Sequence, residues 1–486
     1  MSDASFLTEI QENCKQLHAQ TAYSCSEEKL TWGELWQKAC ALAAFLKEDG
    51  VGPVLVYGHK SPDMPVSFLA CLLSGRAYLP CDSGTPPARI RRICEISGAQ
   101  RVIFTEDTEM REQHALTKRM LADIYSRGGG YDFCDNPNRT AYIIFTSGST
   151  GEPKGVPITV GNLQNFINWV TALPAIAELG HGAVLNQAAF SFDLSVADLY
   201  IALVTGRPLF ALTRQEQRNP CLLFARVKES GCELAVCTPT FLQGCLLNAG
   251  FNRTLLPALR TVFCCGEPLL PATAKKLLAR FPGIRVLNAY GPTEATCAVC
   301  AAEVEDWMLT RPALPVGRIG QTAVNIRLDS TLSSDEIVLR GASVSPGYLG
   351  AQSAAFRDGC YYTGDIGRVM DGWLYCLGRK DDQIKYKGYR IEPAEIEHCL
   401  CRIEGINSAA VLPIENGRGK ILRLCAAVQT MRRDLTTETI KAELKRTLPV
   451  YMIPKTIAVY ERLPVNANGK CDRNRLREGF LHGENG

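Results

Sequence analysis

The sequence predicts an α/β fold, with a large N-terminal domain over residues 1–380 and a small α+β domain over residues 381–486. Three observations lead to this prediction. Strand-like and helix-like segments alternate through the first half, which is typical of a largely parallel sheet covered by helices. Glycine-rich, strand-like segments follow from about Ile326 and predict a small β-rich portion. The charged segment Gly378–Gly388 precedes renewed apolar periodicity, and is therefore the expected domain boundary.

The first expected helix is Thr31–Lys47, because Leu35, Leu42 and Leu46 recur at helical spacing. Thr31 stands three residues before Glu34, which is the spacing of a capping box. The alternation continues through Phe190–Gly206 and Leu222–Gly244. The other elements expected in this half are strands at Val54–Tyr57, Arg101–Thr105, Ala141–Thr146, Leu259–Gly266 and Arg285–Asn288, and helices at Met64–Gly75 and Pro271–Phe281.

The second half is expected to begin with strands at Glu336–Arg340 and Trp373–Leu377. Apolar periodicity then predicts the elements of the small domain. These are helices at Pro393–Cys401 and Glu438–Thr447, and strands near Ala409–Pro413 and at Leu422–Gln429.

Composition excludes several classes of protein. With 46% hydrophobic and 21% charged residues, the chain of 486 residues resembles ordinary globular proteins. Lys and Arg exceed Asp and Glu by 53 − 50 = 3, which is too balanced for nucleic acid to be the main partner. No apolar run reaches the roughly 18 residues of a membrane helix, so membrane insertion is not expected. The N-terminus shows no signal peptide, which predicts a cytoplasmic protein.

The 21 cysteines show no disulfide framework, and most are expected to be buried thiols in a reducing compartment. Cys399 and Cys401, beside His398, form the one close pair that suggests zinc. A second pair at zinc-ligand spacing is missing, so a metal site there is not expected.

An apolar strand runs into a loop of small hydroxyl and glycine residues over Ile143–Gly155. Such a loop offers backbone N–H groups and hydroxyl donors to a polyphosphate, and Lys154 adds a compact positive charge. The spacing is not that of a Walker A loop. The alternative is an ordinary surface turn.

Three further segments carry groups suited to nucleotide chemistry. Asn288–Thr296 places Tyr290 and Glu294 on one turn, where a ring can stack on a purine and a carboxylate can hold Mg²⁺. Asp365 offers two acceptor oxygens to a ribose diol, with Arg379 following. Lys470 lies on a tight turn near the C-terminus. Each has a simpler interpretation: a core tyrosine, a turn-capping aspartate, or an exposed cation.

These segments occur in one order, and over Leu30–Leu476 the chain resembles the adenylate-forming superfamily of acyl-CoA synthetases, luciferases and nonribosomal-peptide adenylation domains. Within it, Asn162–Trp169, Leu185–Val196, Phe263–Glu267 and Gly341–Leu349 resemble the D-alanine–D-alanyl carrier protein ligases. The resemblance implies ATP and Mg²⁺ as cofactors and D-alanine as substrate. It also implies a separate phosphopantetheinylated carrier protein as partner, in the first step of teichoic acid D-alanylation.

The resemblance also implies the roles of individual residues. Lys470 and Glu294 are the expected catalytic residues, with Glu294 placing Mg²⁺ through the nucleotide. Asp381 matches the hinge between the domains, and Gly388 the tunnel for the carrier thiol. The ATP-binding residues are Thr146, Ser147, Gly148, Ser149, Thr150, Lys154, Asn288, Ala289, Tyr290, Gly291, Pro292, Thr293, Asp365, Cys376, Leu377, Gly378, Arg379 and Lys470.

The amino-acid substrate is expected to contact Asp193, Cys265, Cys297 and Lys470. By resemblance, Asp193 pairs with the α-ammonium, since a buried cation needs an anion beside it. Its alternative role is the N-cap of a helix over Leu194–Leu203. Cys265 matches the cysteine that favours the D-enantiomer, and its alternative is a core thiol. Cys297 departs from the usual valine, but is close to it in size.

Two shortened segments, after Glu106 and at Asp329–Glu336, also depart from the family pattern. Three other activities therefore stay open. A stand-alone amino-acid adenylation enzyme feeding a nonribosomal peptide pathway would share every motif. A CoA ligase for a small carboxylic acid would not need Asp193. A non-enzymatic adenylate-binding relative is disfavoured by the presence of Lys470 and Glu294.

Overall fold

The computed structural model divides into two compact units, which are described separately. Unit 1 comprises Met1–Ser83, Ser97–Ile144 and Gly155–Lys380, and unit 2 comprises Gly84–Ile96, Phe145–Lys154 and Asp381–Gly486. No helix among the described residues is long and apolar enough to cross a membrane. The structure describes residues 5–26, 28–110, 112, 114–129, 133, 136–148, 151–330, 335–416, 421–432, 434–464 and 471–482.

The largest sheet of unit 1 has eight strands, and its central strands from β13 to β1 are parallel. Parallel strands bring their carboxyl ends to one edge, where binding residues of α/β proteins gather. Its strands, in spatial order, are β14 (Cys300–Glu303), β13 (Arg285–Tyr290), β12 (Thr261–Cys264), β11 (Cys232–Cys237), β9 (Ala183–Asn186), β10 (Leu209–Ala211), β1 (Thr21–Cys25) and β2 (Glu28–Thr31).

Two more sheets complete the strands of the large unit. A six-stranded sheet runs in the order β6 (Ala115–Leu116), β5 (Arg101–Phe104), β3 (Val54–Tyr57), β4 (Tyr78–Cys81), β7 (Thr140–Thr146) and β8 (Lys154–Thr159). The β-rich portion is an antiparallel sheet of β15 (Gly317–Arg318), β20 (Trp373–Arg379), β19 (Cys360–Met370), β17 (Glu336–Arg340) and β16 (Asn325–Asp329), with β18 (Phe356–Arg357) paired to β19.

Helix α2 (Trp32–Glu48) begins where its capping box predicts. The Glu34 N–H donates to Thr31 Oγ1 at 3.2 Å, and the Thr31 N–H donates to Glu34 Oε2 at 2.8 Å. The other described helices of this unit are α1 (Phe6–Gln16), α3 (Asp63–Ser74), α5 (Lys118–Ser126), α6 (Val160–Thr171), α7 (Pro174–Ala177), α8 (Leu194–Thr205), α9 (Arg214–Arg218), α10 (Pro220–Glu229), α11 (Pro239–Cys245), α12 (Pro271–Arg280), η1 (Thr293–Ala295) and η2 (Asp306–Thr310).

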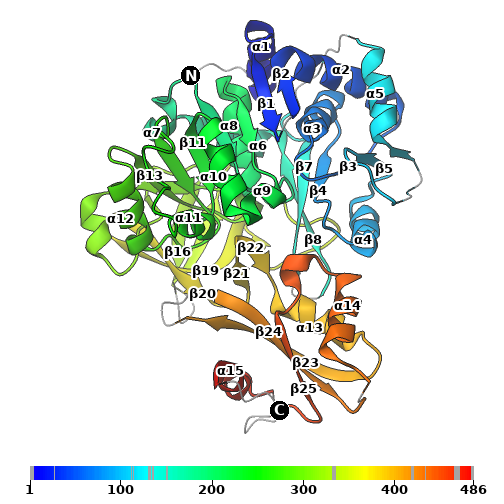
Figure 1. Cartoon of the computed structure of the whole chain (residues 1–486), viewed down its shortest axis with the longest axis vertical. Helices are drawn as coiled ribbons and strands as arrows, with labels where there is room; N and C mark the ends of the chain where they lie inside the picture. The colour runs from blue at the N-terminus through cyan, green and yellow to red at the C-terminus, as the bar shows by residue number, and fades with distance from the viewer. Residues whose placement is uncertain are drawn as a thin grey trace. The chain divides into compact units, whose positions relative to one another are not determined.

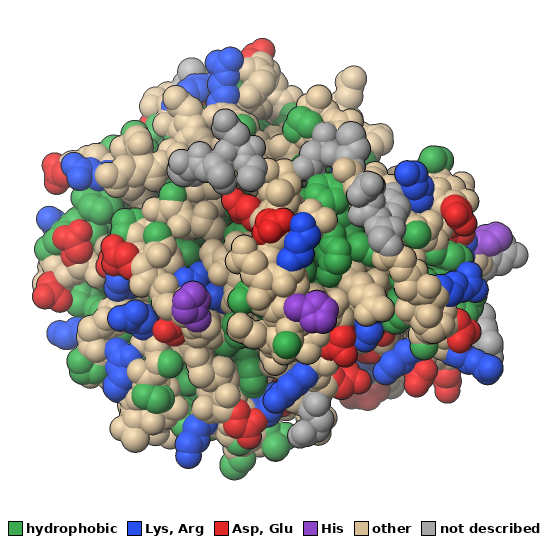
Figure 2. Space-filling model, turned by 90° about the horizontal axis from the view of Figure 1, so that it is seen from above, with side chains coloured by type: hydrophobic (Ala, Val, Ile, Leu, Met, Phe, Trp, Pro, Cys, Tyr) green, Lys and Arg blue, Asp and Glu red, His purple; other side chains and the backbone are tan. Residues whose placement is uncertain are grey.

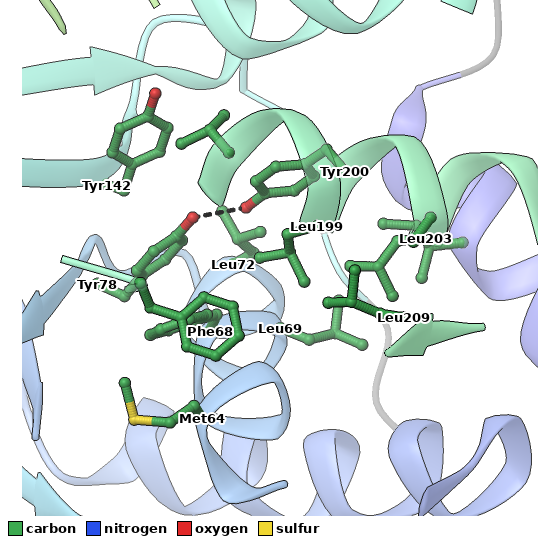
Figure 3. Close-up of a cluster of buried hydrophobic side chains, with 14 of the residues drawn as sticks. Met64, Phe68, Leu69, Leu72, Tyr78, Tyr142, Leu199, Tyr200, Leu203 and Leu209 are labelled. Carbon is green, nitrogen blue, oxygen red and sulfur yellow. Dashed lines mark hydrogen bonds between the residues drawn. The ribbon is translucent and has the colours of Figure 1, made fainter. Parts of the chain in front are cut away.

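Helix α8 lies in the middle of the main hydrophobic core. Every residue from Leu194 to Leu203 is buried, including the polar Ser195 and Asp198. In Figure 3, α8 packs against α3, and the hydroxyls of Tyr78 and Tyr200 are hydrogen-bonded at 2.9 Å. The opposite face of the eight-stranded sheet forms a second core with α10, α11 and α12 (Figure 1). The sheet is therefore covered on both faces, as the alternating sequence predicted.

Unit 2 has its own apolar core around a three-stranded sheet. Strand β24 pairs antiparallel with β23 and parallel with β25. The elements of unit 2 are α4 (Pro87–Ser97), β21 (Ile384–Tyr386), β22 (Tyr389–Ile391), α13 (Pro393–Cys401), β23 (Ile406–Glu415), β24 (Ile421–Thr430), α14 (Thr437–Lys445), η3 (Val450–Met452), β25 (Thr456–Tyr460) and α15 (Arg473–His482).

The predicted elements agree closely with the structure. The strands Val54–Tyr57 and Glu336–Arg340 and the helix Pro393–Cys401 have the expected bounds. The expected strand Ala409–Pro413 is longer, because its pairing with β24 extends over Ile406–Glu415. On the face in Figure 2, acidic and basic side chains are interspersed, which matches the nearly balanced charge of the sequence.

Candidate functional site

Asp193 stands directly before α8, at the carboxyl side of the loop that follows β9. It is buried, and its carboxylate oxygen Oδ2 accepts a hydrogen bond of 2.5 Å from the hydroxyl of Thr293. Its side chain makes no capping hydrogen bond to α8, and its backbone is already helical. Asp193 therefore stands at the N-cap position, as the alternative interpretation expected, but its carboxylate does not cap the helix, since a capping side chain accepts from the first-turn N–H groups.

Cys265 and Cys297 come together beside Asp193, although they are 32 residues apart. The Cys265 thiol donates to the Cys297 carbonyl oxygen at 3.9 Å, and both residues are buried in the main core. A hydrogen bond with the Cys265 thiol, burial, and the nearby Asp193 charge raise the pKa of Cys297 well above its usual range. The structure thus brings the buried Cys265 and Cys297 together, with the Asp193 carboxylate near enough to affect the Cys297 pKa.

The turn after β13 combines rigid backbone with buried polar groups. Gly291 is required by close packing, because a Cβ there would lie 2.5 Å from the Cα of Ala298. Asn288 donates its side-chain amide to the Pro315 carbonyl at 2.8 Å, so it holds the turn in place. Ala289 is buried within β13, and Pro292 precedes η1 in an extended conformation.

Tyr290 and Asp365 form a buried pair that also includes Arg379. The Tyr290 hydroxyl donates to Asp365 Oδ2 at 2.6 Å, and the Arg379 guanidinium lies 2.8 Å from Oδ1. Burial and the Asp365 charge raise the pKa of Tyr290, which keeps the phenol protonated as a donor. Of the neighbouring predicted residues, Cys376 is half-buried, Leu377 is exposed and Gly378 has a positive φ of 144°.

Glu294 is fully buried, on the short helix η1. The Tyr348 hydroxyl donates to its Oε1 at 2.6 Å, and the Ser345 N–H donates to its carbonyl oxygen at 2.8 Å. Carboxylate oxygens are the ligands that Mg²⁺ prefers, so the chemistry of Glu294 fits this ion. Tyr348 was not predicted as a site residue. Its place in the Gly341–Leu349 segment, which carries the family resemblance, could have identified it as a site residue.

The predicted phosphate loop follows β7 and lies in unit 2. Thr146 and Ser147 are buried, and Ser147 Oγ donates to the Arg390 carbonyl at 2.9 Å and accepts from the Glu392 N–H at 3.0 Å. Gly148 needs to be glycine, because a Cβ would lie 2.0 Å from the Glu152 carbonyl oxygen. Lys154 begins β8, on the far side of the loop. Ser149 and Thr150 lie outside the described residues.

The remaining predicted residues also belong to unit 2. Asp381 accepts from the Gln383 N–H at 3.3 Å in a local turn. Gly388 and Lys387 form the two-residue turn between β21 and β22, with φ of 84° and 54°. A two-residue hairpin turn with two positive φ angles favours glycine, so Gly388 has a local structural reason as well. Lys470 lies outside the described residues.

Sequence reasoning missed a buried polar network beneath the Asp193 loop. The Lys60 ammonium donates to Asn186 Oδ1 and the Ala188 carbonyl, and lies 4.6 Å from the centre of the Phe190 ring. Asn186 in turn donates to Asp198 Oδ2 at 2.8 Å. Lys60 thus fixes the segment that leads into Asp193. Lys60 could have been identified from its place shortly after β3, at the carboxyl end of a parallel strand.

Asp198 is expected to make stability depend on pH. Burial raises its pKa to about 8, whereas its pKa in the unfolded chain is about 4. Between these two pH values the folded protein therefore holds a proton that the unfolded chain has released. The free energy of unfolding therefore falls as pH rises through this window, by at most about 1.4 kcal/mol per pH unit. Burial lowers the pKa of Lys60 to about 8, so Lys60 adds no slope below that pH.

An Asp198→Asn variant removes this group while keeping an acceptor for Asn186. Denaturant midpoints measured across this pH range should show the variant gaining stability relative to the parent as pH rises. Asp123→Asn, which changes an exposed carboxylate on α5, is the matched control and should show no such trend. A parent–variant difference that stays constant with pH would contradict the prediction.

Known protein families and relatives match nearly the whole chain. Residues 10–349 match the family model described as AMP-binding enzyme, and residues 395–470 match the AMP-binding enzyme C-terminal domain. A D-alanine–D-alanyl carrier protein ligase of Bacillus licheniformis is 40% identical, over 94% of this chain and 96% of the relative. The ligase of the same name from Bacillus velezensis is 38% identical, over 95% and 96%.

Solved structures show the same fold. Holo-PA1221, a nonribosomal peptide synthetase protein with adenylation and carrier domains, is 25% identical with a TM-score of 0.83, over 97% of this chain and 84% of that chain. The Vibrio cholerae adenylation domain AlmE, in complex with glycyl-adenosine-5′-phosphate, is 22% identical with a TM-score of 0.83, over 99% and 98%.

Proposed function

Since this chain belongs to the AMP-binding enzyme family, we propose that it activates D-alanine with MgATP and passes the D-alanyl group to a separate carrier protein. The acceptor is the phosphopantetheine thiol of that carrier, in the first step of teichoic acid D-alanylation. The observation that carries the proposal is the buried Asp193 carboxylate beside the thiols of Cys265 and Cys297. The near-full-length identity to the two Bacillus ligases supports it.

Amino-acid recognition is assigned to this cluster. Asp193 accepts the α-ammonium, and the hydroxyl of Thr293 orients its carboxylate through the hydrogen bond of 2.5 Å. A charge buried this deeply is favourable only when it is paired, so a substrate without an ammonium binds poorly. The thiols of Cys265 and Cys297 bound the space for the substrate side chain. Two small apolar groups favour a methyl over a larger side chain.

Nucleotide recognition is assigned to the residues around Tyr290 and to the phosphate loop. Asp365 accepts from the ribose hydroxyls, and Arg379 and Tyr290 hold its carboxylate in place. The N–H and hydroxyl groups of Thr146–Thr150 donate to the phosphates, and Lys154 neutralises part of their charge. Glu294 would supply one carboxylate to a Mg²⁺ ion bound with ATP, which would neutralise part of the phosphate charge.

The first half-reaction is an in-line displacement. A carboxylate oxygen of D-alanine attacks the α-phosphorus, the bond to pyrophosphate breaks, and D-alanyl-adenylate forms. Lys470 bridges the attacking carboxylate and the α-phosphate oxygens, where it stabilises the charge that builds in the transition state. Positioning and charge neutralisation supply most of the rate enhancement in phosphoryl chemistry of this kind.

The second half-reaction is transfer to the thiol. The pantetheine sulfur attacks the acyl carbon, loses its proton, and AMP leaves. We assign the change between the two steps to rotation of residues 381–486 about Asp381, which withdraws Lys470. The turn at Gly388 then lines the path of the pantetheine arm.

ATP–pyrophosphate exchange across both alanine enantiomers, glycine, serine and acetate tests this function. D-Alanine is expected to give the fastest exchange, since it presents the ammonium to Asp193 and a methyl group to Cys265 and Cys297. We expect its kcat/KM to exceed that of every other acid by about tenfold or more, or about 1.4 kcal/mol. Faster exchange with a larger L-amino acid would favour a nonribosomal peptide pathway, and faster exchange with acetate would favour a CoA ligase.

A further inference from the structure

The two thiols beside Asp193 are arranged as a pair, not as separate core residues. Cys265 follows β12, and its neighbour Cys264 packs into the opposite core, so the two side chains leave the strand on different faces. The Cys265 thiol reaches the Cys297 carbonyl at 3.9 Å, and Cys265 is the neighbour that most raises the pKa of Cys297. Both are free thiols.

The backbone at Cys297 is held in an unusual conformation. Thr296 and Cys297 both have left-handed φ angles, of 60° and 70°, which costs a non-glycine residue roughly 1 kcal/mol or more. Thr296 Oγ1 donates to the Ser343 carbonyl at 2.7 Å, and the Ala298 N–H donates to the Thr296 carbonyl at 2.8 Å. These bonds hold the backbone on both sides of Cys297 in place.

A second observation indicates that a polar ligand binds at this point. The hydroxyl of Tyr142 is buried, and it has no hydrogen-bond partner among the described residues. Its electrostatic environment includes both Cys297 and Asp193. In Figure 3 this hydroxyl points away from the neighbouring Tyr78–Tyr200 pair. A buried hydroxyl without a partner is costly, so a ligand that supplies one is stabilised here.

We propose that Cys265 and Cys297 form a dithiol site that binds one trivalent arsenic centre, supplied as arsenite. Arsenous acid, As(OH)₃, condenses with the two thiols. Two As–S bonds replace two As–O bonds, the thiol protons leave on two water molecules, and arsenic keeps its oxidation state. The remaining As–OH group is the partner for the Tyr142 hydroxyl.

The chemistry of these thiols suits this ligand better than an alkylating agent. Their hydrogen bond and burial raise the pKa of Cys297, so little thiolate is present at neutral pH. Alkylation needs a thiolate and is slow at such a residue. Arsenite uses protonated thiols and gains from the fact that both are held together in advance. An occupied site also fills the space beside Asp193, which predicts inhibition of amino-acid activation.

The test measures arsenic bound per chain after gel filtration, with full-length protein, arsenite and excess 2-mercaptoethanol. The monothiol competes with single cysteines such as the exposed Cys221 and Cys401, but not with a two-thiol chelate. We expect one arsenic per chain in the parent, removed by 2,3-dimercaptopropanol. Cys265→Ala and Cys297→Val should each lower retained arsenic at least tenfold. In a separate measurement without the monothiol, which would replace the remaining As–OH group, Tyr142→Phe should weaken arsenic retention several-fold, as expected for one lost hydrogen bond.

Two matched controls remove other thiols. Cys237 contacts Cys264 across neighbouring strands in the second core, and Cys300 donates to the Tyr290 carbonyl. Cys237→Ala and Cys300→Ala should retain arsenic like the parent. Retention of arsenic by Cys297→Val, or its loss in Cys237→Ala, would overturn the proposal. If a variant folds poorly, peptide mapping of the parent identifies the cysteines that hold arsenic and so tests the proposal without that variant.

The test of the dithiol site does not depend on which amino acid is activated, because bound arsenic is measured without any enzyme turnover. Protection by D-alanine with MgATP is a separate measurement. Protection supports both the site and its place in the amino-acid pocket. Arsenic on the pair without protection would support the dithiol and contradict that placement, whereas no arsenic on the pair would contradict the dithiol whatever the substrate.

Discussion

Replacing Asp193 by asparagine is expected to abolish amino-acid activation while leaving ATP binding intact. The variant keeps the shape of the side chain and an acceptor for Thr293, but it leaves the substrate ammonium buried without an anion. Breaking a buried ion pair by removing one partner costs about 3–5 kcal/mol, or at least about 100-fold in kcat/KM. D-Alanine-dependent pyrophosphate exchange measures the loss, and calorimetry with ATP measures nucleotide affinity.

Two other variants separate the charge of Asp193 from its surroundings. Thr293→Val removes the orienting hydrogen bond but keeps the carboxylate, so we expect a loss of about fivefold, in line with roughly 1 kcal/mol for one bond. Asp306→Asn changes an exposed carboxylate on η2 and should match the parent. A collapse of ATP affinity in Asp193→Asn would show that this residue supports the fold of the site instead of binding the substrate.

Lys470→Ala is expected to abolish adenylate formation but to spare transfer of a preformed D-alanyl group. The lysine charge is useful while negative charge builds at the α-phosphate, and the thiol step has no such charge to stabilise. Removing a preorganised charge contact costs about 10²–10³-fold in rate. Pyrophosphate exchange measures the first step. Chemically made D-alanyl-adenylate and holo carrier protein, followed by mass spectrometry of the carrier, measure the second.

Lys441→Ala provides the matched control in the same unit, because Lys441 is only half-buried and its ammonium donates to the Lys455 carbonyl in a solvent-exposed hydrogen bond. It should leave both half-reactions unchanged. Equal losses in the two half-reactions of Lys470→Ala would mean that one arrangement serves both, and the proposed rotation about Asp381 would then fail for this protein.

The elements whose cause is local could be predicted from the sequence alone. The bounds of β3, β17 and α13 follow from short apolar periods, and the start of α2 follows from Thr31 and Glu34, three residues apart. Periodicity and capping act over a few residues, so they can be read without knowing the fold. The order of the motifs likewise predicted the family.

Other local causes were present in the sequence but were interpreted incompletely. By resemblance Gly388 matches the tunnel for the carrier thiol, and its two-residue hairpin turn gives the glycine a local structural reason in addition. Asp193 stands at the N-cap position, as the alternative interpretation expected, yet its side chain turns away from the helix toward Thr293. Position along the chain indicated where each residue lies, but not which group its side chain contacts.

The contacts between distant segments depend on the three-dimensional fold and could not be predicted from local patterns. Asp193 meets Thr293, Glu294 meets Tyr348, and Tyr290 meets Asp365 across 54 to 100 residues. The Lys60–Asn186–Asp198 network and the Cys265–Cys297 pair arise in the same way. These neighbours are set by the order of strands in the sheets, which crossover connections make independent of sequence order. Strand order depends on packing of the whole core, so a pattern that spans a few residues does not contain it.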